Sequence, residues 1–115
     1  MDHKIQKWLY DVKIAIEEID SFFVGQPMIF SEYQKNKMRK RAVEREFEII
    51  GEAINRIIKK DESYIEKIRD SLNIVGLRNL VIHAYDNISD ENIWAILINH
   101  LPRLRQDIEL LLQEN

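Results

Sequence analysis

Apolar residues recur at intervals of three and four at both ends of the chain, and this spacing constrains the fold more than any other feature of the sequence. The N-terminal series runs from Ile5 to Phe23 and predicts a helix over residues 2–24, ended by Gly25. The C-terminal series runs from Ile93 to Leu111. Three glycines and two prolines in 115 residues are too few for the turns of a β-sandwich or a doubly wound sheet. We therefore expect an all-α protein.

The second predicted helix begins at Ser31, a good N-cap residue, and ends near Lys59. It would be longer than most globular helices, so a break inside it remains an open alternative. The residues expected to face the core are Met38, Ala42, Ile49, Ile50, Ala53, Ile54 and Ile57, with Phe47 near the edge.

Two further helices are predicted between this long helix and the C-terminal one. A short helix over 64–71 follows the turn residues 61–63, and a fourth helix begins near Asn73 and is broken at Asp86 and Asn87. About five helices then make up one domain, residues 1–115, folded as an antiparallel bundle with the short helices across one end.

The last predicted helix begins at Ser89 or Asp90 and contains a proline. The ring of Pro102 would meet the carbonyl group of Ile98, so we expect a kink there.

The composition excludes several classes of protein. The chain has no cysteine, which rules out disulfides and thiolate metal sites. No apolar run is long enough to span a bilayer, and a net charge of -3 does not indicate a nucleic-acid binder, although a local basic patch remains compatible with a small RNase. His3 and His100 have no acidic or histidine partner at ligand spacing, so no metal and no cofactor is expected. A cytoplasmic protein fits these properties best.

The segment from Arg78 to Tyr85 is the strongest candidate for a functional site. Arg78 and His83 differ by roughly 140° around an ideal helix, whereas Asn79 and His83 share a face. The polar groups can therefore meet only where a helix ends, with the long arginine side chain reaching toward the imidazole.

These residue types suit phosphodiester chemistry on RNA. Histidine exchanges protons near neutral pH, and arginine carries a permanent charge on a planar fork that matches phosphate. A base for the 2′-hydroxyl and a cation for the phosphorane would suffice without a metal. Spacing alone leaves a plainer alternative open, in which Arg78 and His83 only complement a helix C-terminus and Tyr85 is a buried aromatic residue.

Basic residues also crowd the start of the second predicted helix. They can either contact RNA phosphates or form a solvated face beside neighbouring glutamates. These residues are Lys35, Lys37, Arg39, Lys40, Arg41 and Arg45.

Three segments together resemble one known family. Arg78, Asn79, His83 and Tyr85 resemble the Arg-and-His motif of HEPN domains in the form found in the HepT toxin branch. Residues 41–53, RAVEREFEIIGEA, resemble that branch's second-helix signature. Leu-Pro-Arg-Leu at residues 101–104 resembles the Leu-Pro-x-Leu of its last helix. The resemblance covers nearly the whole chain, and the elements occur in the same order.

The resemblance implies a HEPN-like helical bundle that forms a homodimer, with the two motif helices facing each other across a cleft. It implies a metal-independent endoribonuclease toxin in which Arg78, Asn79 and His83 are catalytic. It further implies a cognate antitoxin, a minimal nucleotidyltransferase of the MntA type, that transfers AMP to Tyr85. HEPN relatives that only bind a nucleotidyltransferase, without cleaving RNA, provide the alternative.

Overall fold

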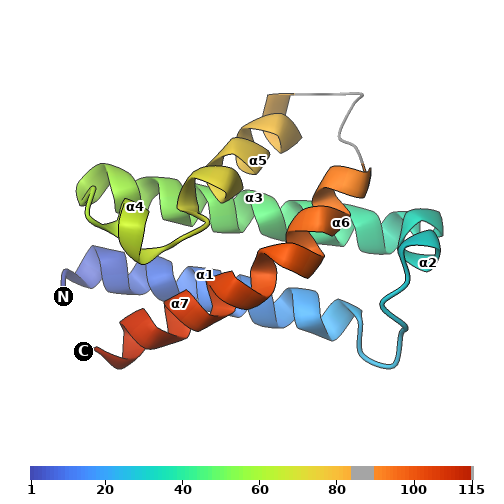
Figure 1. The fold of residues 1–115 in the computed structure, drawn as a ribbon, viewed down its shortest axis with the longest axis horizontal. Helices are drawn as coiled ribbons and strands as arrows, with labels where there is room; N and C mark the ends of the chain where they lie inside the picture. The colour runs from blue at the N-terminus through green and yellow to red at the C-terminus, as the bar shows by residue number, and fades with distance from the viewer. Residues whose placement is uncertain (84–89, 115) are drawn as a thin grey trace.

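The structure, a computed structural model, describes residues 1–83 and 90–114, and the side chains of residues 1–77 and 90–114. Within these ranges the chain forms helices and no strands, which confirms the predicted all-α class (Figure 1). The helices are α1 (His3–Phe22), α2 (Phe30–Lys35), α3 (Lys37–Lys60), α4 (Tyr64–Lys67), α5 (Ser71–His83), α6 (Asp90–Asn99) and α7 (Leu101–Gln113).

The first helix follows its prediction closely. The side chain of Asp2 caps α1 by accepting hydrogen bonds from the backbone N–H groups of Lys4 and Ile5, at 2.7 and 3.1 Å. Beyond the other end, Gly25 has a φ of +71°, a conformation that glycine adopts without steric cost. Asp2 thus caps the start of α1, and Gly25 provides a turn shortly after its end.

The predicted second helix is two helices, separated at Asn36. Asn36 has an extended conformation, and its side chain accepts a hydrogen bond from the backbone N–H of Arg39, at 3.0 Å, so it caps α3. The N-cap of α2 is Ile29 rather than Ser31. Met38, placed on the core stripe from sequence, lies in the first turn of α3 and is 84% exposed. The stripe begins instead at Val43, and Phe47 is fully buried.

The C-terminal helix is also divided, at His100. Pro102 was predicted to kink one continuous helix, and this prediction was wrong: α6 ends at Asn99 and Pro102 lies in the first turn of α7. Proline is well tolerated there, because the first backbone N–H groups of a helix have no partner within the helix. The breaks at Asn36 and His100 raise the helix number from about five to seven among the described residues.

The remaining boundaries differ from the predictions by a few residues. The short helix α4 ends at Lys67 rather than at residue 71, and α5 begins at Ser71 rather than near Asn73. The expected break at Asp86 and Asn87 lies outside the described residues.

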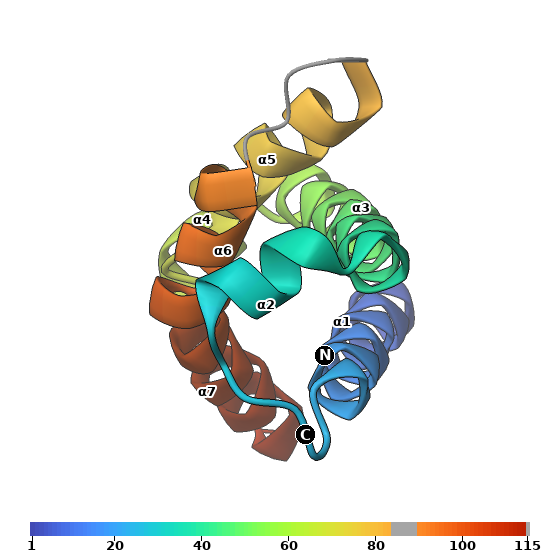
Figure 2. The same cartoon turned by 90° about the vertical axis from the view of Figure 1, so that its right-hand side faces the viewer.

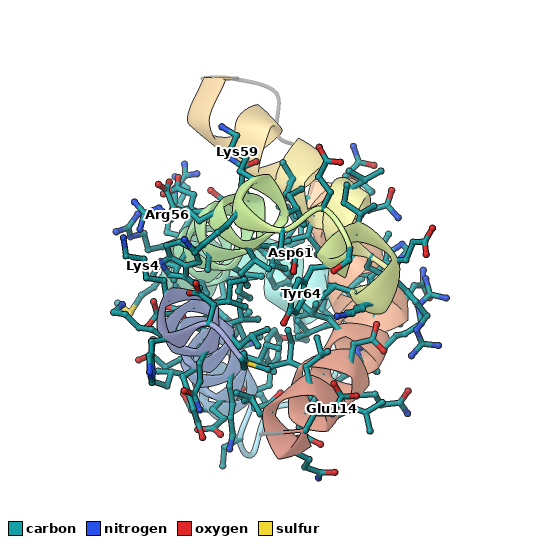
Figure 3. All side chains as sticks on the ribbon, turned by 90° about the vertical axis from the view of Figure 1, so that its left-hand side faces the viewer. Lys4, Arg56, Lys59, Asp61, Tyr64 and Glu114 are labelled. Atoms are coloured by element: carbon teal, nitrogen blue, oxygen red, sulfur yellow. The ribbon has the colours of Figure 1, made fainter. Side chains whose placement is uncertain are left out.

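The helices form an antiparallel bundle, as predicted, but the short helices α2 and α4 lie at opposite ends of it rather than across one end (Figure 1). The long helices α1 and α3 run side by side, α7 packs against α1, and α5 packs against α3. Figure 2 looks along the bundle from the end that α2 crosses. Figure 3 shows the opposite end, where the ring of Tyr64, contributed by α4, points inward and is buried. The core between these ends is almost entirely aliphatic, with Phe47 and Tyr33 as its largest side chains.

Candidate functional site

Helix α5 carries the predicted site in its second half. The backbone of Arg78, Asn79 and His83 lies within α5, and the described part of this helix reaches to His83. The expected helix end beside the motif lies outside the described residues. The side chains of these three residues and the whole of Tyr85 lie outside the described part of the structure. Figures 1 and 2 both show this half of α5 slanting away from the bundle.

The first half of α5 is firmly packed. Ile74 is fully buried and Leu77 nearly so, and both contribute to the core that α5 shares with α3. At the start of the helix the Ser71 hydroxyl donates a hydrogen bond to the carbonyl oxygen of Ile65, at 3.1 Å. The motif is therefore carried on a helix whose opposite end is fixed.

A buried aspartate ties the start of α5 to the start of α7. Asp70 is 0% exposed, and its carboxylate accepts two hydrogen bonds from the Arg103 guanidinium, at 2.6 and 2.9 Å. Nδ1 of His100 lies 2.7 Å from the same carboxylate. Arg103 first, and His100 after it, hold the pKa of Asp70 below its ordinary value in spite of burial. This cluster corrects the sequence expectation that His100 lacks an acidic partner.

Arg69, next to Asp70 in the sequence, makes a second connection to α7. Asp107 on α7 accepts hydrogen bonds from the backbone N–H of Arg69, at 3.0 Å, and from its guanidinium, at 2.8 Å. Arg69 and Asp70 are thus both bonded to α7, at residues more than thirty positions away in sequence. Consecutive ion pairs of this kind fix the direction in which α5 leaves the bundle.

A groove separates the first half of α5 from α6. It has a volume of about 420 Å³, and its walls include Asn73 and Gly76 from α5 and Ala95 from α6. His100 lines the groove at the junction of α6 and α7. Sequence analysis did not identify this groove, because its walls come together only through the antiparallel arrangement of α5 and α6.

The basic residues near the start of α3 divide into two groups. Three of them form ion pairs: Lys40 with Asp90 at 3.0 Å, Arg41 with Glu44 at 3.0 Å and Arg45 with Glu48 at 2.9 Å. The others, Lys35, Lys37 and Arg39, line a shallow hollow at the junction of α2 and α3. The guanidinium of Arg39 also lies over the ring of Phe23, 5.2 Å from its centre. The pair of Lys40 and Asp90 joins α3 to the beginning of α6.

A buried carboxyl group on α3 was not identified from the sequence. Glu46 is only 6% exposed, and its Oε2 atom has no hydrogen-bond partner among the described residues. Burial, followed by the neighbouring Glu18 carboxylate, raises the pKa of Glu46 to about 7, while Arg45 acts in the opposite direction. Glu46 lies three residues after Val43 and four before Ile50, and this spacing of core residues in a helix is the sequence signal for such a group.

Among the described side chains, those of residues 1–77 and 90–114, histidine, aspartate and glutamate do not gather in a group of three that could hold a metal ion. No helix in the same part of the chain combines the length and the apolar character that crossing a membrane requires.

Comparison with known proteins places the chain in a family. The family model described as "Ribonuclease HepT-like" matches residues 12–111, a stretch that includes Arg78, Asn79, His83 and Tyr85. A protein of Methanocaldococcus jannaschii named "Putative RNase" is 32% identical over 112 residues, which cover 96% of this chain and 88% of the relative.

Two other relatives carry the same name. A second protein of M. jannaschii is 32% identical over 108 residues, covering 92% of this chain and 94% of the relative. A protein of Caldanaerobacter subterraneus subsp. tengcongensis is 29% identical over 85 residues, covering 74% of this chain and 75% of the relative. No solved structure shows a significant match. From the match of the family model over most of its length, the chain belongs to the HepT-like ribonuclease family.

Proposed function

We propose that this chain is a metal-independent endoribonuclease and the toxin of a toxin–antitoxin pair. The observation that carries the proposal is the family match over residues 12–111, within which Arg78 and His83 lie in the second half of α5. The names of the relatives agree with an activity on RNA. The anchored first half of α5 supports the proposal, because catalysis requires groups held in a fixed position.

In the proposed reaction the imidazole of His83 takes the proton from a ribose 2′-hydroxyl. The 2′-oxygen then forms a bond to phosphorus, the bond from phosphorus to the 5′-oxygen breaks, and the 5′-oxygen receives a proton. The products are a 2′,3′-cyclic phosphate and a 5′-hydroxyl. Arg78 stabilises the negative charge that develops on the phosphate oxygens, and Asn79 orients the pair.

A homodimer would supply the second proton-transfer group. Each chain contributes one motif histidine, and the reaction needs both a base and an acid. With the motif helices of two subunits facing each other, one His83 can accept the first proton while the partner's His83 donates the second. The slant of α5 away from its own bundle leaves the motif end at the periphery, where a second subunit can approach it (Figure 2).

The direct test is RNA cleavage by the purified protein in the presence of EDTA. Wild type is expected to generate 2′,3′-cyclic phosphate ends, and Arg78→Ala and His83→Ala are expected to lose activity by at least about 10²-fold. Lys59→Ala, an exposed substitution at the end of α3, is the control and keeps wild-type activity. Equal activity in wild type and both motif variants would contradict the proposal.

The proposed regulation is tested separately. A cognate nucleotidyltransferase of the MntA type, supplied with ATP, is expected to raise the intact mass in steps of one AMP, and Tyr85→Phe to abolish the increase. Each AMP adds a negatively charged phosphate at Tyr85, seven residues after Arg78 in the sequence. This phosphate would compete with the phosphates of RNA for the Arg78 guanidinium. If the transferase binds but wild type neither gains mass nor cleaves RNA, the alternative of a non-catalytic binding partner is favoured.

A further inference from the structure

The groove between α5 and α6 has a glycine from the middle of a helix in its wall. Gly76 lies in its wall, in the middle of α5, and is exposed. A Cβ atom added at Gly76 would meet nothing within 4 Å. Glycine weakens a helix relative to alanine, and within the described residues no close packing requires it here. The absence of a side chain at Gly76 instead keeps the groove open.

The opposite wall is open for the same reason. Ala95 on α6 lines the groove and is exposed, so each wall has one small residue, beside the larger aliphatic side chains of Leu72, Leu77 and Ile96. The volume of about 420 Å³ lies within the range of about 300–1,000 Å³ that is common for small-molecule sites. The groove can thus accept a group the size of a nucleobase.

The polar side chains of the groove are ones that read bases. The imidazole of His100 is held at Nδ1 by the buried carboxylate of Asp70 and lines the groove. Asn73 also lines it and provides an amide group. Amides hydrogen-bond to the edges of unpaired bases, and planar rings stack on them, which is how proteins recognise single-stranded RNA.

The electrostatic character of the groove also suits RNA. Among the described residues that line it there is no aspartate or glutamate, and the Asp70 charge behind His100 is fully buried and neutralised by Arg103. The hollow between α1 and α3, by contrast, is lined by several carboxylates, including Glu48 and Glu52. Of these two depressions, the groove is the one that a polyanion can enter without facing negative charge.

The register of α5 places the groove next to the motif. Gly76 precedes His83 by seven residues, which is two helical turns on the same side of the helix and about 10 Å along its axis. From these observations, we infer that the groove of Asn73, Gly76, Ala95 and His100 binds one unstacked base of a single-stranded RNA whose phosphate is held at the motif. This inference rests on the proposed nuclease function and adds a base-binding subsite to it.

The test measures binding without cleavage. The probe is a short fluorescein-labelled single-stranded RNA with every 2′-hydroxyl methylated, so that it cannot be cut, and its affinity for the full chain is measured by fluorescence anisotropy. Gly76→Leu and Ala95→Leu fill the groove from opposite walls and are expected to weaken binding about 5- to 100-fold, the range for loss of one stacked base. Gly76→Ala leaves space in the groove and is expected to bind as wild type does.

A set of abasic probes locates the subsite. Removing the base at one position of the RNA should weaken binding to wild type, and the same removal should have no effect on Gly76→Leu, whose groove is already filled. The matched control is Gln113→Leu, which adds an apolar side chain to an exposed position near the end of α7. Wild-type affinity in both groove-filling variants, or equal abasic penalties in wild type and Gly76→Leu, would overturn the inference.

Two measurements distinguish the base-binding subsite from a subunit interface and from the nuclease function: the molecular mass in solution and the rate of RNA cleavage. If Gly76→Leu changes the molecular mass in solution from dimer to monomer, the groove is a subunit interface and the base-binding inference fails. Wild type that binds the probe through the groove but leaves unmodified RNA intact would support the subsite and contradict the nuclease. Wild type that cuts RNA as fast as Gly76→Leu does would support the nuclease and contradict the subsite.

Discussion

Replacing Glu46 by glutamine should stabilise the protein at alkaline pH and leave it unchanged at mildly acidic pH. In the folded chain Glu46 is buried next to Glu18, which raises its pKa from 4.5 to about 7. The native state therefore holds a proton between these two pH values that the unfolded chain has released. As a result, the free energy of unfolding falls as the pH rises from 4.5 to about 7 and is constant above that range.

The size of the effect follows from the two pKa values. A rise from 4.5 to about 7 corresponds to a loss of about 3 kcal/mol between mildly acidic and alkaline pH. Glu18 is exposed and can turn away from an ionised Glu46, so we expect the observed effect to be about 1–3 kcal/mol. Glutamine keeps the shape of the side chain and cannot ionise, so the Glu46→Gln variant avoids this loss.

Urea unfolding at pH 5 and pH 8 measures the effect directly. Glu46→Gln should match wild type at pH 5 and exceed it at pH 8, and Glu18→Gln should show a smaller gain of the same sign. Glu17→Gln, exposed on the same helix, is the matched control and should change the free energy of unfolding by less than about 0.5 kcal/mol. If Glu46→Gln were destabilised equally at both pH values, Glu46 would be an ordinary ionised side chain and the reasoning would be refuted.

Three other substitutions test features that determine the fold. Asp70→Asn should lower the free energy of unfolding by about 2–3 kcal/mol at neutral pH, because Arg103 loses its buried charged partner. Since the pKa of Asp70 is lowered in the folded chain, the difference in unfolding free energy between wild type and Asp70→Asn should shrink as the pH falls below 3.8. Pro102→Ala should change thermal stability by less than about 0.5 kcal/mol, whereas relief of a proline inside a continuous helix would stabilise by about 3 kcal/mol. Asn36→Ala should cost about 1 kcal/mol in urea unfolding, whereas Asn36→Ser, which can still accept the hydrogen bond from Arg39 N–H, should cost little; equal losses in these two variants would show that the cap bond is unimportant.

Helix positions could be predicted from the sequence because the relevant signals are local. The apolar spacing of residues 5–23 and the Asp2 and Gly25 ends are contained in one short segment, and α1 was predicted almost to the residue. The excessive length of the second helix indicated a break without showing its position. Asn36 was missed because a single capping side chain inside a basic, helix-favouring segment gives a weaker signal than the periodicity around it.

The polar clusters could not be predicted, because their members are distant in sequence. Asp70 and His100 are 30 residues apart, and no periodicity or spacing rule links them. Pro102 illustrates the same limit: its conformational preference was known, but the sequence does not show whether a helix bends around a proline or ends and begins again before it. The motif of Arg78 and His83 is the reverse case, because its residue types and spacing are local and were identified from the sequence alone.

The two halves of α5 have separate physical roles, and this separation makes the proposed function testable. The first half is fixed by apolar burial and by the ion pairs of Arg69 and Asp70 with α7, so substitutions there act on stability and on the direction of the helix. The second half carries Arg78 and His83, the two residues that we propose act on RNA. A variant of the first half should therefore lose activity in proportion to unfolding, whereas a motif variant should lose activity while unfolding as wild type does. Measuring both quantities on the same variants distinguishes a catalytic motif from a residue pair that only caps the helix.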